Sequence, residues 1–270
     1  MRGLPELIAC EFLKLKRRKI LPAVVALALL FPLLVVFVTR SGMNGDGSLS
    51  YLQGRFDYSY TLMLSYGLVL LEPCLLGVLA SLLFFQERDN DTFKNIRAIP
   101  VAATKLVVTK LLVLLIYSLI YTLANVCFTV IFTWIFDAGT VYGLVFKFGF
   151  ACMFSVGITI ATLPVVVFIV YFNKTYLISM LLSFFYSVLS WAALVVVSMN
   201  ESLIKIINYF PVLCMLNWSS GVMIRQMPQR NLAPEAYDLV PSNPEAALIL
   251  GITLAVSLWL IFRFYRRWTR

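Results

Sequence analysis

Six stretches of the chain are apolar over 19 to 26 residues each. A helix needs about 20 mostly apolar residues to cross the roughly 30 Å hydrocarbon core of a bilayer. Because lipid offers no hydrogen bonds to the backbone, only helices and closed barrels can span it. The sequence therefore predicts an all-α polytopic integral membrane protein with six transmembrane helices, at Ile20–Val38, Thr61–Phe85, Leu111–Phe136, Phe148–Tyr171, Tyr176–Ser198 and Ala246–Phe264.

The overall composition excludes an ordinary soluble domain. Of the 270 residues, 61% are hydrophobic and 13% are charged, whereas soluble domains average about half apolar and a quarter charged. A soluble protein of this composition would expose large apolar patches and associate through them. The chain shows no internal repeat, linker or low-complexity tract, so we expect a single transmembrane domain over residues 1–270.

The formal net charge of +9 has two interpretations. A basic protein can bind nucleic acid, but Lys and Arg also accumulate in the cytoplasmic loops of membrane proteins. If the N-terminus is cytoplasmic, 16 of the 22 Lys and Arg residues fall on the cytoplasmic side of the six predicted helices. Position thus accounts for the charge. We predict no nucleic-acid partner, and a plasma-membrane protein with both termini in the cytoplasm.

Residues 1–19 are predicted to form an amphipathic helix in the inner membrane interface, leading into the first span. Its apolar residues recur at helical spacing, and its charged residues lie elsewhere on the helical wheel. This pattern is typical of an interfacial helix, and the alternative is a disordered basic tail. The apolar residues are Leu4, Leu7, Ile8, Phe12 and Leu15.

The most charged cytoplasmic segment is residues 86–110, between the second and third predicted spans, and residues 86–105 are its candidate docking part. A short predicted helix, Thr92–Ile99, is capped by Asp91 or Asn90 and broken by Pro100. A second helix is predicted to start near Ala102–Thr104 and to run into the third span. Held across the membrane surface by two spans, the short helix can dock into a groove on a cytoplasmic partner. The alternative is a solvated loop that only follows the distribution of positive charge. The candidate docking residues are Glu87, Asp91, Thr92, Phe93, Ile96, Arg97 and Pro100.

Residues 199–245 form a long predicted extracellular loop with short apolar stretches and several prolines. Part of it is a candidate re-entrant region, which a membrane tolerates only where protein covers the backbone.

Candidate catalytic residues are scarce. The chain has no histidine, which removes the usual general base, metal ligand and pH switch. Its five cysteines form no C-x-x-C pair, and no G-x-x-x-x-G-K-[ST] phosphate-binding run occurs. We therefore predict that this chain alone is not an enzyme and binds no metal or cofactor.

Glu72 is the one acidic residue clearly inside a predicted span, and Pro73 follows it. A carboxylate at this depth is costly unless it faces water or a partner, and such residues are usually functional. One interpretation places Glu72 on the substrate path, where it meets a cationic substrate. The other is a protonated Glu hydrogen-bonded to a neighbouring helix beside a proline kink.

These features resemble the permeases of type-2 ATP-binding-cassette (ABC-2) exporters. Those permeases carry an interfacial elbow helix, six spans, and a coupling segment that reads Glu, Gly-Thr, a hydrophobic helix, Pro and a later Lys. This chain has Glu87, Asp91-Thr92, Phe93 to Ile96, Pro100, Lys105 and Lys110, with Asp91 in place of the usual Gly. The elbow is similar to residues Glu11–Ile20, and the extracellular re-entrant region to the long loop before the last span. The sequence Asn90–Asn95, NDTFKN, most resembles the lantibiotic-immunity and bacitracin-resistance permeases of Gram-positive bacteria.

The resemblance implies a permease subunit of a bacterial exporter that expels amphipathic antimicrobial peptides for lantibiotic immunity or antibiotic resistance. It implies two cytoplasmic ABC ATPase subunits, which bind ATP and Mg, and a second permease subunit, either identical or different. One alternative is an ATP-independent secondary transporter or channel for a small or lipid-like substrate, which usually carries several ionisable groups in its spans or repeated halves. A second is a polytopic membrane enzyme, which would need a cluster of reactive groups at one membrane depth.

Overall fold

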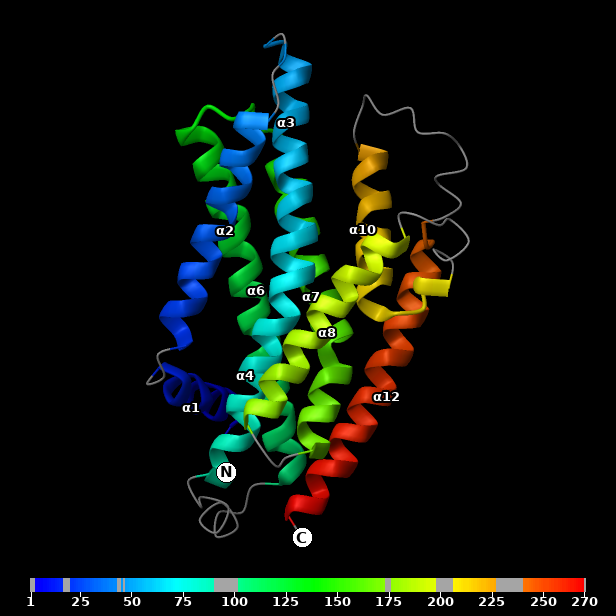
Figure 1. Ribbon diagram of the computed structural model, residues 1–270. Helices are drawn as coiled ribbons and strands as arrows, with labels where there is room; N and C mark the ends of the chain where they lie inside the picture. Colours follow the sequence, from blue (N-terminus) through cyan, green and yellow to red (C-terminus); the bar gives the residue numbers. More distant parts are fainter. Residues whose placement is uncertain are drawn as a thin grey trace.

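The computed structural model describes residues 3–16, 20–42, 45, 47–89, 102–172, 176–197, 206–226 and 240–269. The regular elements in these ranges are all helical, and Figure 1 shows them as an elongated bundle. They are α1 (Leu4–Lys16), α2 (Ile20–Gly42), α3 (Leu49–Leu62), η1 (Met63–Leu71), α4 (Glu72–Asp89), α6 (Ala103–Ile135), α7 (Leu144–Phe172), α8 (Tyr176–Val197), α10 (Pro211–Gln226) and α12 (Asn243–Thr269).

The helices confirm a multi-pass membrane protein. Four helical stretches are long and apolar enough to cross a bilayer: Leu49–Phe85, Ala103–Ile135, Leu144–Phe172 and Asn243–Arg267. They contain the second, fourth and sixth predicted spans, and the third except for its last residue, Phe136. The first and fifth fall in α2 and α8, whose described apolar stretches are shorter, so the count of six spans stays a prediction.

The second and third membrane helices are longer than the predicted spans. The rod of α3, η1 and α4 begins at Leu49 rather than near Thr61. The helix α6 begins at Ala103, which confirms the predicted helix start near Ala102–Thr104. A span predicted from hydropathy ends where charged residues begin. The helix itself can continue past them, particularly where the charged side chains find partners inside the protein. Both extensions hold buried charged side chains that are described below.

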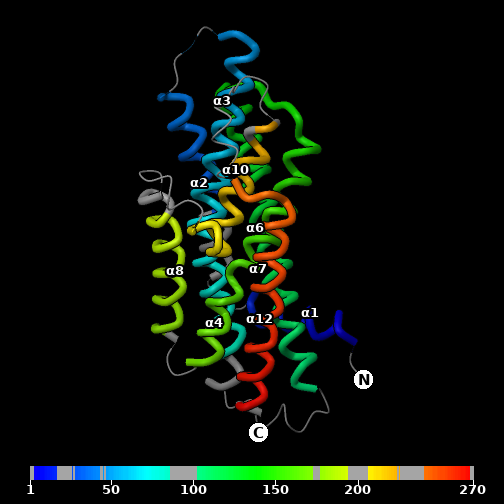
Figure 2. The backbone as a smooth tube through the Cα atoms, turned by 90° about the vertical axis from the view of Figure 1, so that its right-hand side faces the viewer, coloured from blue at the N-terminus to red at the C-terminus, as the bar shows by residue number. Residues whose placement is uncertain are grey.

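Both termini lie at one end of the bundle (Figure 1). At that end α1 lies across the direction of the long helices in both views (Figure 1, Figure 2). Its predicted apolar face is turned toward the protein, since Leu15 is buried and Ile8 and Phe12 pack against the core. Leu13, off that face, is exposed. The amphipathic pattern therefore describes a real helix, and its position in the membrane interface stays a prediction.

The helix α7 lies at the centre of the bundle, where it packs against α4, α6, α8, α10 and α12. The helix α10, within the region predicted to be re-entrant, reaches from the end opposite the termini toward the middle of the bundle (Figure 1, Figure 2). Trp218 of α10 stacks on Phe150 of α7 with ring centroids 5.6 Å apart, and its indole donates to the Asn243 side chain at 2.8 Å. These contacts fasten α10 between α7 and the start of α12.

Close approach of α4 and α8 depends on Gly77. A Cβ atom at this position would lie 2.1 Å from Oγ and 2.4 Å from Cβ of Ser183 on α8. Ser183 is short and buried, so it has little room to move away. A side chain at Gly77 would therefore push the two helices apart.

We expect Gly77→Ala to lower the free energy of unfolding by about 1 to 3 kcal/mol, the usual cost of overpacking. Thermal unfolding of the purified protein in mild detergent measures the change. The matched control is Gly251→Ala on α12, where no atom lies within 4 Å of the new Cβ. That control is expected to be neutral or to stabilise the protein by at most about 1 kcal/mol. Equal unfolding temperatures for the two variants would contradict the close packing of α4 on α8.

Candidate functional site

Glu72 stands at a change of helix type. The nine residues of η1 form a π-helix. The α-helical winding resumes with α4, whose first two residues are Glu72 and Pro73. Carbonyl groups in this part of the rod receive side-chain donors from neighbouring helices. Ser187 of α8 donates to the Leu70 carbonyl, and Tyr121 of α6 donates to the Gly67 carbonyl at 3.4 Å. A π-segment stabilised from outside in this way is typical of functional positions in helices.

The Glu72 carboxyl group faces α6 and is 1% exposed. Ser118 donates a hydrogen bond to its Oε1. Thr122, one turn further along α6, lies 3.3 Å from Oε1 and 3.4 Å from Oε2. Ser118 also lies 2.6 Å from the Ser155 hydroxyl of α7. One polar cluster thus joins α4, α6 and α7 in the middle of the bundle.

These contacts bear on the two interpretations of Glu72. The carboxyl group is enclosed by hydroxyl groups, as expected of a Glu that is satisfied by a neighbouring helix. For Glu72 to reach a substrate, α4 and α6 would have to separate along this line. The role of Glu72 on the substrate path therefore stays a prediction. That role now also requires α4 to move away from α6.

A stripe of polar residues extends this cluster along one face of α6. Asn125 donates to the Tyr121 carbonyl at 2.9 Å, and its Oδ1 has no hydrogen-bond donor among the described residues. Thr129 and Thr133 bond to backbone carbonyls of their own helix. The spacing of three or four residues puts the stripe on one side of the helix. Its fully buried members are Ser118, Thr122, Asn125, Thr129 and Thr133.

A second polar cluster lies near the end that holds the termini. Lys110 of α6 is 1% exposed, and its ammonium donates to the Leu83 carbonyl of α4. Glu11 of α1 lies 3.9 Å from the same ammonium and 2.5 Å from that of Lys14. We call this set the Lys110 clamp: Lys110, Leu83 and Glu11. It ties the short amphipathic helix to both membrane helices that flank the predicted coupling segment.

The coupling residues themselves are placed only in part. Asp91, Thr92, Phe93, Ile96, Arg97 and Pro100 lie outside the described residues, as does the side chain of Glu87. The backbone of Glu87 belongs to α4, which ends at Asp89 toward the termini (Figure 1). Glu87 and Glu72 are 15 residues apart on one helix, or about 22 Å at 1.5 Å per residue. The structure therefore keeps the two predicted sites at different depths.

A buried ion pair at the opposite end is absent from the sequence predictions. Lys147 of α7 lies 2.9 Å from Asp57 of α3, and both side chains are buried. Tyr142, in the turn before α7, donates to Asp57, and its ring centroid is 3.9 Å from the Lys147 ammonium. Burial raises the pKa of the Tyr142 phenol, and the bond to Asp57 raises it further. The phenol is therefore a hydrogen-bond donor at any physiological pH.

The described residues contain no group of three His, Cys, Asp or Glu side chains that could hold a metal ion. The polar clusters consist of hydroxyls, carboxyls and ammonium groups that bond to one another across helices. Such an arrangement can fix helices together or release them.

We expect Lys147→Met to lower the free energy of unfolding by about 3 to 5 kcal/mol, because Asp57 would keep a buried charge without a positive charge beside it. Asp57→Asn in the same background should recover part of the loss. Denaturation in detergent of both single variants and the double variant gives the coupling energy between the two positions. Lys105→Met, at an exposed lysine of α6, is the control and should stay within about 0.5 kcal/mol of the wild type. Additive losses would contradict a direct interaction.

Comparison with known protein families gives a match. A family model described as "ABC-2 family transporter protein" matches residues 7–190, which is more than half of the chain. The matched stretch contains Glu72, the Lys110 clamp and the predicted coupling segment, and it ends within α8. No curated protein matches the chain.

Proposed function

Because the chain belongs to the ABC-2 family of transporter proteins, we propose that it is the permease of an exporter that removes amphipathic antimicrobial peptides from a bacterial cell membrane. Membership of the family makes it a membrane component of an ABC transporter and agrees with its having no enzymatic role of its own. Permeases of this family generally pair with ATPase subunits. The direction of transport, the substrate and the arrangement of subunits are the parts that we add.

The Lys110 clamp is the observation that supports this function best. The segment between α4 and α6 begins and ends at helices that Lys110 joins directly, and Glu11 adds α1 to the same junction. A force applied to that segment by a cytoplasmic ATPase would therefore reach three helices together. Buried, partnered charges are costly to separate, so the junction would pass the force on rather than absorb it.

In the proposed complex two ATPase subunits bind ATP and Mg, and a second permease, identical or related, completes the path. Glu87, Asp91, Thr92, Phe93, Ile96, Arg97 and Pro100 form the docking segment. Closure of the ATPases pushes this segment, and α4 moves against α6. Both termini lie in the cytoplasm in this arrangement, in accord with the excess of Lys and Arg on that side.

The proposed substrates are cationic amphipathic peptides of the lantibiotic or bacitracin type. Movement of α4 away from α6 would break the bonds of Ser118 and Thr122 to Glu72. The freed carboxylate would then favour a cationic group on the substrate, while the apolar side chains around it accept the rest of the peptide. Return of α4 restores the hydroxyl bonds and expels the cation.

An ATP-independent transporter remains the second candidate for a specific reason. The structure buries more ionisable groups than the sequence indicated, since Asp57, Lys147 and Lys110 join Glu72. Several buried ionisable residues are typical of secondary transporters. Here Asp57 and Lys147 neutralise each other, and Lys110 is held by a carbonyl and by Glu11. These partners favour structural roles, and isolation of the complex decides between the two functions.

We expect Phe93→Asp and Arg97→Glu each to reduce co-purification of the ATPase subunit by at least about tenfold, equivalent to about 1.4 kcal/mol of docking energy. A pull-down in mild detergent followed by an ATPase assay measures this. Arg225→Glu, at an exposed residue of α10 near the other end, is the matched charge reversal and should change neither yield nor rate. Undiminished yield from both docking variants would refute the docking role. If the wild type itself isolates without an ATPase, the second candidate gains.

We expect Glu72→Gln to lower peptide export and resistance while leaving membrane insertion and ATPase binding intact. The amide keeps hydrogen bonds to Ser118 and Thr122 but loses the negative charge that a cationic substrate requires. The minimum inhibitory concentration of a lantibiotic in cells with the variant complex measures the effect. Resistance equal to that of the wild type would remove Glu72 from the transport mechanism.

A further inference from the structure

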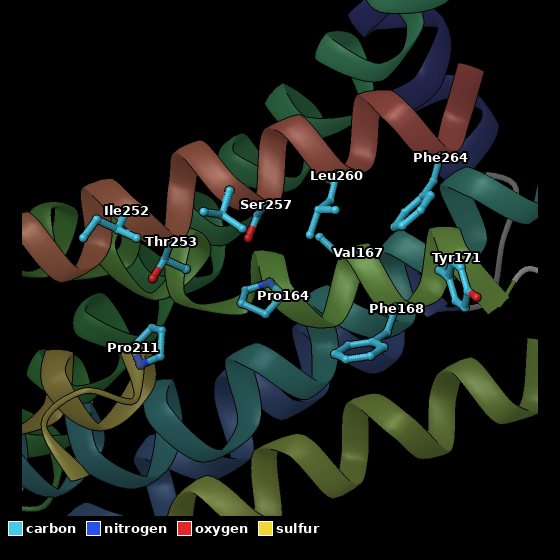
Figure 3. A pocket seen from close by; sticks show the side chains of 11 residues that line it. Pro164, Val167, Phe168, Tyr171, Pro211, Ile252, Thr253, Ser257, Leu260 and Phe264 are labelled. Carbon is cyan, nitrogen blue, oxygen red and sulfur yellow. The ribbon is translucent and has the colours of Figure 1, made fainter. Parts of the chain in front are cut away.

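An apolar groove of about 510 Å³ runs between α7 and α12, with Pro211 of α10 at one end. Figure 3 shows side chains of α12 facing Pro164, Phe168 and Tyr171 across it. The hydroxyl of Thr253, which also lines the groove, is already bonded to the Ile249 carbonyl at 2.8 Å. The lining therefore offers apolar contact and few hydrogen bonds. We call it the α7–α12 groove.

The groove lies on an apolar surface that the described residues of this chain leave exposed. In α12 only 17% of the most apolar window is buried, against 44% to 72% in the other three long apolar stretches. The rim residues Phe168, Ile252 and Val256 are each more than half exposed. A groove in this position is filled by whatever lies beside the protein in the membrane.

The length of the groove matches one leaflet. From Ile252 to Phe264 the lining follows 12 residue steps of α12, or about 18 Å at 1.5 Å per residue. Half of a hydrocarbon core is about 15 Å. A single acyl chain fits this span.

The end of the groove nearest the C-terminus is cationic. The ring centroids of Phe264 and Tyr171 lie 4.9 Å apart. The Arg267 guanidinium lies 5.7 Å from the centroid of the Phe264 ring. Arg267 also lines a second cavity of about 740 Å³, together with Thr104, Trp259 and Arg263. Arg263 lies 5.4 Å from the centroid of the Trp259 ring. The described lining of the two cavities includes no acidic side chain.

We propose that the α7–α12 groove binds an anionic phospholipid from the leaflet on the side of the termini. One acyl chain occupies the groove from Phe264 toward Ile252, and the phosphate lies at Arg267 and Arg263. A basic pocket between membrane helices with an apolar extension is the chemistry that an anionic lipid requires. The inference does not depend on the ATPase or on the peptide substrate. Both α12 and its arginines lie outside the residues matched by the family model.

The test uses the full chain, purified in detergent, delipidated and titrated with phosphatidylglycerol or phosphatidylcholine that carry the same oleoyl chains. Native mass spectrometry counts the lipid bound. We expect the wild type to prefer phosphatidylglycerol and Arg267→Gln to weaken that binding about fivefold, the effect of one arginine at a membrane surface. Thr253→Phe, which fills the groove, should weaken binding of both lipids.

Matched controls separate these effects from damage to the fold. Ala255→Phe adds the same ring to an exposed position of α12 that does not line the groove, and Arg225→Gln removes a distant exposed charge. Neither should change lipid binding, and all variants are first checked for wild-type unfolding temperatures. Excess inorganic phosphate should not displace the lipid, because it cannot replace the acyl chain.

Four outcomes would overturn the proposal. The first is equal binding of the two lipids by the wild type, and the second is unchanged lipid binding by Thr253→Phe. The third is displacement of the lipid by inorganic phosphate alone. The fourth is a change in the oligomer mass of Thr253→Phe without a change in its lipid binding. The last would assign the groove to contact with a second copy of the chain.

Discussion

Polar groups buried in a membrane protein must find partners within the protein, because lipid supplies none. This constraint accounts for the three polar clusters, which lie at three depths and each connect neighbouring helices. Lys147 joins α7 to α3, Glu72 joins α4 to α6, and Lys110 joins α6 to α4 and α1. Apolar contact between these helices competes with equally apolar lipid, so close packing and the polar bonds together specify which helix lies beside which.

The helices were largely predictable, and the contacts of their charged residues were not. Apolar runs of about 20 residues identify membrane helices because the bilayer imposes that length. The same criterion placed Asp57 and Lys147 outside the spans, since charged residues lower the hydropathy of any window that contains them. Their pairing joins positions 90 residues apart, and no local pattern reveals it. Lys110 was predicted as part of the coupling motif, but its contacts with Leu83 and Glu11 depend on how three helices meet.

The functional residues divide in a similar way. Glu72 stood out because a lone carboxylate in an apolar run is costly wherever it points. Its partners did not, because Ser and Thr are common in membrane helices and bond readily to their own backbone. A signal was present in the spacing of Ser118, Thr122, Asn125, Thr129 and Thr133, which places five polar side chains on one face of α6. The π-helix before Glu72 has no comparable signature, since its carbonyls are satisfied by Tyr121 and Ser187 from distant parts of the sequence.

The π-helix has a mechanical consequence for the rod that contains it. Each residue of a π-helix advances the chain around the axis by less than the roughly 100° of an α-helix. If the nine residues of η1 tightened into α-helical turns, α4 would rotate relative to α3 about their common axis. The bond from Lys147 to Asp57 holds the α3 side against rotation, so the torsion would act on the α4 side, where Glu72 meets Ser118. A local change in the helical winding of η1 would thus become a rotation of α4 relative to α3.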